Sequence, residues 1–316
     1  MRNKIALVGS GNIGGTLAHL AAIKELGDVT LFDIAEGIPQ GKSLDLAQSG
    51  PVENFDSKMI GSNDYKDLKD SDVVIVTAGV ARKPGMSRDD LIEINFSIIK
   101  QIGKAIKKYC PKAFIICVTN PLDAMVWSLK TIAKINKKMI VGMAGILDSS
   151  RFKYFLSNEL KVSMECIQTM VLGGHGDTMV PLLRFTSVSG IPIHEFISKG
   201  LITDAKLQEI VDRTRNGGGE IVSLLKDSSA FFSPALSVIE MIESFIFDQK
   251  KLLPCSAFLD GEYNVRDIFA GVPVIIGGNG LEKILELKLN DREKREFKES
   301  TNSVKKLINK CKKLLV

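Results

Sequence analysis

Apolar residues recur along this chain in two patterns, which are short uninterrupted runs and longer stretches with helical spacing. In the first half the short runs lie at residues 5–8, 29–33, 59–60, 72–78, 114–118 and 140–143. Runs this short and this apolar are typical of strands that are buried on both faces of a parallel sheet. Helical spacing lies between them, most clearly over residues 13–26 and 89–109. Six strands that alternate with helices predict an α/β fold, a Rossmann doubly wound parallel sheet.

The second half of the chain mixes the two patterns and does not alternate them. Helices are expected over residues 148–160, 205–225, 234–247 and 304–315, and strands over residues 166–172, 182–188, 252–259 and 272–277. This mixture predicts a mixed α+β substrate domain over residues 146–316, after a dinucleotide-binding domain over residues 1–145. No linker rich in Pro, Gly or Ser separates the two, so we expect them to share a tight interface.

The composition is that of an ordinary globular protein, with 45% hydrophobic and 25% charged residues in a chain of 316. The net charge of +5 owes much to lysines in residues 304–315, whose apolar positions have helical spacing. No aromatic residues lie among these lysines, so we expect no nucleic-acid binding. No apolar run approaches the ~20 residues of a membrane span. The five cysteines form no CxxC pair, which favours a cytoplasmic protein without disulfides or a metal site.

The segment Gly9-Ser10-Gly11-Asn12-Ile13-Gly14 fits the GxGxxG motif of dinucleotide-binding proteins. It follows a predicted strand and opens a predicted helix, which is the context that gives the motif its meaning. The glycines permit a tight turn and close approach to a pyrophosphate, and the helix N-terminus offers free N–H groups. Asp33 ends the second strand, nineteen residues after Gly14. Its carboxylate would bind ribose hydroxyls and repel a 2′-phosphate, which predicts NAD as the cofactor; the alternative is that Asp33 only caps a turn.

His175 is the histidine whose surroundings indicate chemistry. It lies in Gly173-Gly174-His175-Gly176-Asp177, just after a predicted strand, and the glycines allow a ligand to approach closely. An imidazole can take a proton from an alcohol near neutral pH. Asp148 is the candidate carboxylate to orient the ring, and Arg151, three residues further on, would share its helix face. The alternative is a local ion pair in which Asp148 is the N-cap of its helix.

Two arginines, Arg82 and Arg88, lie six residues apart in a segment that follows the predicted strand 72–78. In open α/β sheets the ligand crevice lies beyond the C-terminal ends of the strands. A guanidinium group matches carboxylate and phosphate with two parallel hydrogen bonds, so this segment indicates a small dianionic substrate. The alternative is a solvated basic loop.

Taken together, these motifs resemble the lactate/malate dehydrogenase family from about Lys4 to the C-terminus. The stretches that carry the resemblance are Gly9–Gly14, Asp33, Thr77-Ala78-Gly79, Arg82–Arg88, Val118-Thr119-Asn120-Pro121, Asp148-Ser149-Ser150-Arg151 and Gly173–Asp177. They stand in the order that the family shows. The run Arg-Lys-Pro-Gly-Met-Ser-Arg is similar to that of the malate-oxidising, lactate-dehydrogenase-like branch.

The resemblance implies reversible oxidation of (S)-malate to oxaloacetate by hydride transfer to NAD. His175 would be the acid/base and Asp148 would orient it, while Arg88 would be the third catalytic residue because it polarises the C2 oxygen. The expected substrate-binding residues are Arg82 for the distal carboxylate, Arg88, Asn120, and Arg151 for the C1 carboxylate.

For the cofactor, the resemblance implies contacts from both the glycine loop and the ends of later strands. The expected cofactor-binding residues are Gly9, Ser10, Gly11, Asn12, Ile13, Gly14, Asp33, Asn95, Val118, Thr119 and Asn120. The resemblance also implies a cytoplasmic enzyme of the tricarboxylic acid cycle and a homo-oligomer, either a tetramer or a dimer.

Three other functions are compatible with parts of the sequence. Lactate dehydrogenase is the alternative within the family, and Arg82 argues against it because a neutral residue would suit pyruvate better. An NAD-dependent glycosidase would need a divalent metal, and the few histidines form no convincing ligand cluster. A non-catalytic NAD-binding module would need no acid–base pair, so His175 with Asp148 disfavours it.

Overall fold

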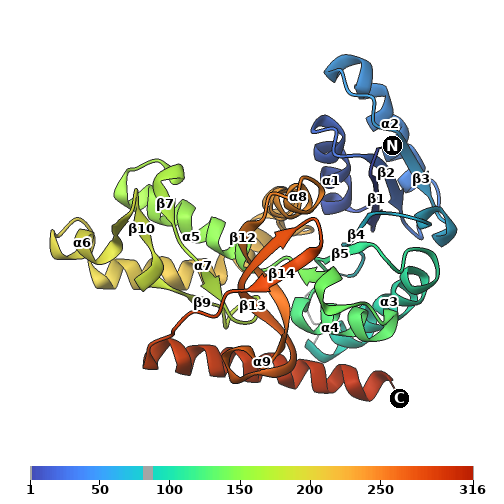
Figure 1. Cartoon of the computed structure of the whole chain (residues 1–316). Coiled ribbons are helices and arrows are strands. Elements are labelled where there is room, and N and C mark those ends of the chain that lie inside the picture. The colour runs from blue at the N-terminus through green and yellow to red at the C-terminus, as the bar shows by residue number, and fades with distance from the viewer. Residues whose placement is uncertain (1, 81–87, 316) are drawn as a thin grey trace.

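The computed structural model describes residues 2–80 and 88–315, and for residues 88 and 89 it describes only the backbone. A nine-stranded sheet runs through this part of the chain, in the order β14-β13-β12-β6-β5-β4-β1-β2-β3 (Figure 1). Its first six strands are β1 (Lys4–Val8), β2 (Asp28–Phe32), β3 (Met59–Ser62), β4 (Val73–Val76), β5 (Phe114–Cys117) and β6 (Ile140–Gly142). They pair in parallel in the order 3-2-1-4-5-6, which confirms the predicted Rossmann fold.

The same sheet continues into the second half of the chain. Its last three strands are β12 (Lys251–Asp260), β13 (Arg266–Gly277) and β14 (Gly280–Ile284), and β13 pairs antiparallel with both of the others. β12 joins them to the parallel part through the pair Ser256–Gly142. The position of Gly142 is confined, because a Cβ there would lie 3.0 Å from the Ser256 Cβ and 3.3 Å from the Leu122 side chain. The two halves therefore share one sheet as well as an interface.

Helices cover the sheet and make up much of the second half. They are α1 (Asn12–Ile23), α2 (Ile38–Glu53), α3 (Arg88–Tyr109), α4 (Leu122–Ala133), α5 (Gly145–Leu160), α6 (Ile193–Ser198), α7 (Asp204–Leu225), α8 (Phe232–Ile246) and α9 (Asp291–Leu315). The pattern of apolar residues did not predict α2, which contains two prolines and two glycines and has a weak apolar face. It also placed the start of α9 at residue 304, because the turns before that are rich in charged residues.

Two strand predictions in the second half are wrong. Residues 182–188 contain a 3₁₀ turn, Leu183–Phe185, and only β10 (Ser187–Val188) is a strand. The turn forms because the Leu182 carbonyl accepts hydrogen bonds from the Phe185 N–H and the Thr186 hydroxyl. Residues 166–172 are split into β7 (Ile167–Gln168) and β8 (Val171–Leu172), which belong to different small sheets. Their partners are β10 with β11 (Ile191–Pro192) for β7, and β9 (Val180–Pro181) for β8.

The main hydrophobic core lies on both faces of the sheet and includes residues from both halves. Phe114 of β5 is fully buried, and its ring stacks on Phe245 of α8 with the centroids 4.5 Å apart. A second, smaller core around Phe152 holds α5 against α7. No helix in the described part of the chain is long and apolar enough to span a bilayer.

Replacing Phe114 with Ala should destabilise the protein strongly. The change opens a cavity between β5 and α8 and removes the ring stacking, and such changes cost about 3–5 kcal/mol. Urea unfolding at fixed protein concentration, followed by circular dichroism, measures the loss. Tyr154→Ala is the matched control, because Tyr154 is an aromatic residue that is 50% exposed. A loss for Phe114→Ala no larger than that of the control would contradict this account of the core.

Candidate active site

The side chains of His175 and Asp148 form a buried pair. The His175 Nδ1 lies 2.9 Å from Asp148 Oδ2, and the exposed fractions of the two side chains are 13% and 2%. α5 begins at Gly145 with Ala144 as its N-cap, so Asp148 lies in the first turn and is not the N-cap. The local ion pair with Arg151 that the same alternative expected does form. An ionised carboxylate only accepts hydrogen bonds, so His175 Nδ1 carries the proton and Nε2 keeps a lone pair. The imidazole is thus arranged to take a proton at Nε2.

The surroundings of His175 favour its charged form. Burial by itself lowers the pKa of His175, but the charge and hydrogen bond of Asp148 and the charge of Asp123 outweigh burial and the repulsion from Arg151. The net result is a raised pKa. An imidazolium formed during a reaction would therefore be stabilised where it forms.

Arg151 lies beside the same carboxylate and keeps unused hydrogen-bonding capacity. Its Nη1 is 3.4 Å from Asp148 Oδ1, and the side chain is only 14% exposed. Burial lowers the pKa of the Arg151 guanidinium, and the charge of Asp148 offsets only part of this effect. The buried Nε has no hydrogen-bond partner within the described residues. α7 makes room for this side chain with Gly217, where a Cβ would lie 3.2 Å from the Arg151 Cδ. A buried guanidinium with a free donor is suited to bind an anion.

The glycine loop between β1 and α1 has the geometry that dinucleotide binding requires. Gly9 has φ +112°, which side chains rarely adopt, and a Cβ on Gly14 would lie 1.9 Å from the Gly9 carbonyl oxygen. A Cβ on Gly11 would meet no atom within 4 Å. Two of the glycines are therefore needed by the fold itself. The third, at the N-cap of α1, faces open space, where a pyrophosphate could approach the helix N-terminus.

Asp33 lies at the end of β2, next to this loop. Its Oδ2 accepts hydrogen bonds from the Ser10 N–H at 2.7 Å and the Ser10 hydroxyl at 3.0 Å, and its Oδ1 accepts from the Ala35 N–H at 3.1 Å. Burial raises the pKa of Asp33, but these hydrogen bonds more than offset it, so the pKa is lowered. Asp33 thus does cap a turn, and it also presents an ionised carboxylate at the glycine loop.

The ends of β4 and β5 are tied together by Asn95 of α3. Its fully buried amide donates to the carbonyls of Val80 at 3.1 Å and Asn120 at 2.7 Å, and accepts from the Val80 N–H at 2.8 Å. Thr119 donates to the Ala78 carbonyl at 2.7 Å. Both amide donors of Asn95 are used by the protein, so only a lone pair of its oxygen remains for a cofactor. The expected cofactor contacts of Asn95, Val118 and Thr119 stay predictions.

Two expected residues, Arg82 and Arg88, are described in part or not at all, whereas a third, Asn120, is described in full. Arg82 lies outside the described residues, and for Arg88 only the backbone at the start of α3 is described. The exposed Asn120 lies between β5 and α4, and its roles toward substrate and cofactor stay predictions.

Sequence reasoning missed Lys42 and Asp123, which both contact the predicted site. The ammonium group of Lys42, in α2, donates to the carbonyls of Ser10 at 2.7 Å and Gly11 at 3.2 Å. No signal in the sequence points to it, because α2 itself was not predicted. Asp123 accepts a hydrogen bond from the His175 N–H at 2.9 Å. As a lone carboxylate in an apolar helix, Leu122–Ala133, it could have been noticed.

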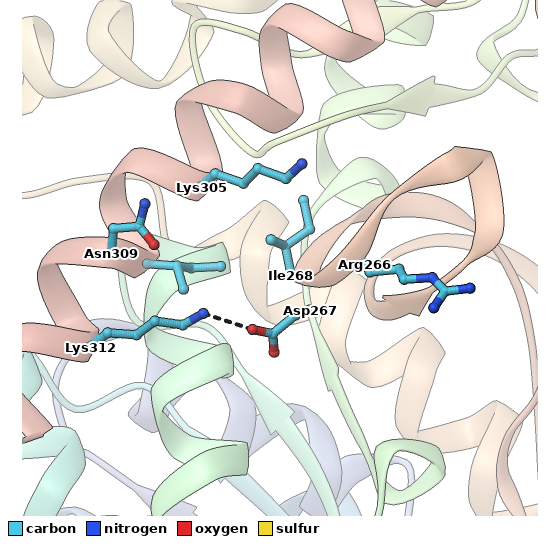
Figure 2. Close-up of a pocket in the computed structure, with 7 residues that line it drawn as sticks. Arg266, Asp267, Ile268, Lys305, Asn309 and Lys312 are labelled. Carbon is cyan, nitrogen blue, oxygen red and sulfur yellow. Dashed lines mark hydrogen bonds and ion pairs between the residues drawn. The ribbon is translucent and has the colours of Figure 1, made fainter.

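The lysines near the C-terminus lie apart from this site. Figure 2 shows a surface cleft between β13 and α9 in which Lys312 forms an ion pair with Asp267, at 2.7 Å. The cleft is lined by Arg266, Asp267, Ile268, Lys305, Ile308, Asn309 and Lys312, and none of the predicted site residues is among them. Lys312 therefore already has an acidic partner within the protein.

The dinucleotide loop, its acidic neighbour and the buried acid–base pair define an NAD-dependent oxidoreductase, and the comparisons narrow this class. Residues 3–142 match the family model described as lactate/malate dehydrogenase, NAD binding domain, and residues 146–315 match the alpha/beta C-terminal domain of the same family. The chain therefore belongs to the lactate/malate dehydrogenase family.

Individual relatives are similar over nearly the whole chain. A malate dehydrogenase of Cereibacter sphaeroides is 59% identical over 311 residues, which cover 98% of this chain and 97% of the relative. The crystal structure of Cryptosporidium parvum malate dehydrogenase matches with a TM-score of 0.97 at 46% identity, covering 99% of this chain and 100% of that one. A lactate dehydrogenase from the same organism, in complex with lactic acid and NAD, matches with a TM-score of 0.96 at 44% identity, covering 99% and 98%.

Replacing Gly11 with Ala should weaken NADH binding without unfolding the protein. The added methyl group meets no protein atom, but it would lie where the pyrophosphate approaches the loop, so we expect at least about tenfold weaker binding. NADH fluorescence titration measures the dissociation constant, and thermal unfolding checks the fold. Gly41→Ala, also in open space but within α2, is the control. Equal NADH affinity in both variants would refute the assigned place of the pyrophosphate.

Proposed function

We propose that this protein catalyses the reversible oxidation of (S)-malate to oxaloacetate with NAD as hydride acceptor. The observation that carries the proposal is the buried His175–Asp148 pair beside the guanidinium of Arg151, which has a buried donor to spare. An acid–base group next to an anion-binding group is what a 2-hydroxy acid requires. The similarity to relatives named malate dehydrogenase supports the choice of malate.

The chain's own residues divide the work of the reaction. Asp148 holds the Nδ1 proton of His175, so Nε2 accepts the hydroxyl proton of malate during oxidation and returns it during reduction. Arg151 holds the C1 carboxylate. NAD, when bound at the Gly9–Gly14 loop beside Asp33, supplies the hydride chemistry. Arg88 is proposed at the C2 oxygen and Arg82 at the distal carboxylate, both on sequence grounds.

Protonation of His175 sets the direction of the pH dependence. Malate oxidation needs the neutral imidazole, so its rate should rise as pH increases through the raised pKa of His175. Oxaloacetate reduction needs the imidazolium and should fall over the same range. Plotted against pH, the rate of malate oxidation should therefore rise and the rate of oxaloacetate reduction should fall, and both changes should be centred on the pKa of His175.

The direct test measures NADH oxidation with oxaloacetate and with pyruvate side by side, and repeats both with NADPH. We expect oxaloacetate with NADH to be the preferred pair. Faster turnover of pyruvate would make this a lactate dehydrogenase. Equal use of NADPH would show that Asp33 does not exclude the 2′-phosphate.

Arg82→Gln should shift the preference from oxaloacetate toward pyruvate. With pyruvate bound, Arg82 would be enclosed without a partner, and an unpaired buried charge costs about 3–5 kcal/mol, or roughly a hundred- to a few-thousand-fold in specificity. The ratio of kcat/KM values for the two substrates measures the shift. The variant Arg2→Gln, at an exposed ion pair near the N-terminus, is the control. An unchanged ratio in Arg82→Gln would show that another residue selects the substrate.

We further propose a homo-oligomer, a dimer or a tetramer, in a cytoplasmic enzyme of the tricarboxylic acid cycle. Large apolar side chains on three helices support the proposed oligomer. They are exposed to water in a single chain, and a subunit interface would bury them. The most exposed are Leu44 (62%) and Val52 (82%) in α2, Leu224 (74%) in α7, and Phe232 (65%) and Leu236 (52%) in α8.

Analytical ultracentrifugation should give a mass two or four times that of the 34.6 kDa chain. Leu44→Lys should lower the mass by placing a charge in an apolar contact. Ile191→Lys, at a residue that is 50% exposed and lies outside these helices, is the control. A monomer in the wild type, or no difference between the two variants, would count against an interface that includes α2.

A further inference from the structure

A second buried carboxylate, that of Asp123, contacts the segment that carries His175. Asp123 lies in the first turn of α4 and is only 4% exposed. Its Oδ2 accepts the hydrogen bond from the His175 N–H at 2.9 Å, and its Oδ1 accepts one from the fully buried Ser256 hydroxyl at 2.6 Å. Asp148 holds the ring of His175 from α5, so the two carboxylates reach the same residue from different helices.

The main chain next to His175 is held from a third helix as well. The fully buried hydroxyl of Ser300, in α9, accepts a hydrogen bond from the Gly174 N–H at 2.8 Å. A Cβ on Gly174 would lie 2.6 Å from Val304 Cγ2 and 3.4 Å from Asp123 Oδ2. This confinement fixes the backbone of Gly174 and His175, and Asp123 is the charged member of the set.

Asp123 acts on His175 through charge as well as through geometry. Burial raises the pKa of Asp123 to about 6, against the hydrogen bonds from Ser256 and His175 that lower it. The carboxyl group is therefore mostly ionised at neutral pH, and its charge favours the imidazolium form of His175. Among the described residues, the charged groups with the largest effects on His175 are Asp148 and Arg151 from α5 and Asp123 from α4.

We propose that Asp123 is a positioning residue that holds the main chain of His175 and adds a second negative charge beside its imidazole. The kinetic consequence rests on the proposed function. The titration of His175 does not, because it can be observed without turnover.

The decisive variant is Asp123→Asn, which removes the charge and keeps the hydrogen bonds. The amide oxygen can accept from the His175 N–H, and the amide N–H can donate to the Ser256 oxygen. NMR titration of the imidazoles is practical because the chain has three histidines, and His175→Asn identifies the signal. We expect the pKa of His175 to fall by roughly half a unit or more.

The matched control is Ser128→Ala, which removes another buried hydrogen bond from α4. Ser128 donates to the Ala124 carbonyl at 2.7 Å and is fully buried. The pKa of His175 should be unchanged in this variant. If Asp123→Asn and Ser128→Ala give the same His175 pKa, the proposal is overturned.

Ser256→Ala changes the charge of Asp123 without touching Asp123 itself. Loss of the hydroxyl donor should raise the pKa of Asp123, so that its charge is lost at a higher pH and the pKa of His175 falls part of the way. A pKa of His175 that rises in Ser256→Ala would contradict the proposed coupling.

The kinetic test follows malate oxidation against pH in the same variants. In Asp123→Asn the acid limb of kcat/KM should move to lower pH by the shift that NMR measures. In Asp123→Ala the His175 N–H and the Ser256 hydroxyl lose their acceptor, so kcat should fall about tenfold or more while the KM for NAD is kept. A loss of kcat/KM that comes only from a higher KM, with kcat unchanged, would overturn the positioning role. If wild type does not oxidise malate yet the NMR shift is present, the proposed function fails and this inference stands.

Discussion

The carboxylate of Asp148 is the group on which the rest of the site depends. A buried charge is stable only where partners replace the water that it has lost, and here those partners are the His175 ring at 2.9 Å and the Arg151 guanidinium at 3.4 Å. The first turn of α5 adds the favourable field of a helix N-terminus. Because the charge is already in place, an imidazolium can form on His175 without reorganisation of the surroundings.

Several segments that are distant in the sequence must pack together to bury the His175–Asp148 pair. The His175 segment is held by α4, α5 and α9, which come from the first half, the start of the second half and the C-terminus. The shared sheet brings them together, because β12 pairs with β6 and places Ser256 against Asp123. This explains why the two halves are joined by hydrogen-bonded strands and not by a flexible linker.

Glycine marks the places where backbone and side chains approach most closely. Glycine inside a helix costs about 0.5–1 kcal/mol relative to alanine, and α7 accepts this cost at Gly217 to leave room for the stem of Arg151. In the first turn of α1, Gly14 likewise leaves room for the Gly9 carbonyl. In both cases a small loss of stability creates space that the proposed reaction uses.

The sequence by itself determined the parallel part of the fold and most of the candidate chemistry. Runs of apolar residues identify β1, β2, β4, β5 and β6 because these strands are buried on both faces, whereas the edge strand β3 is partly exposed. The motifs that carry the family resemblance indicated that His175, Asp148 and Arg151 lie together. The pattern of apolar residues failed to predict elements whose structure depends on tertiary contacts. α2 has too little apolar periodicity to be recognised. The segment around Leu183 forms a turn because the Leu182 carbonyl accepts hydrogen bonds from both a backbone N–H and the Thr186 hydroxyl. Only the tertiary structure decided that Asp123, 52 residues before His175, supports its main chain and that Lys42 supports the glycine loop. Hydrogen bonds between residues so far apart depend on how helices pack, and packing leaves no periodic signal in the chain.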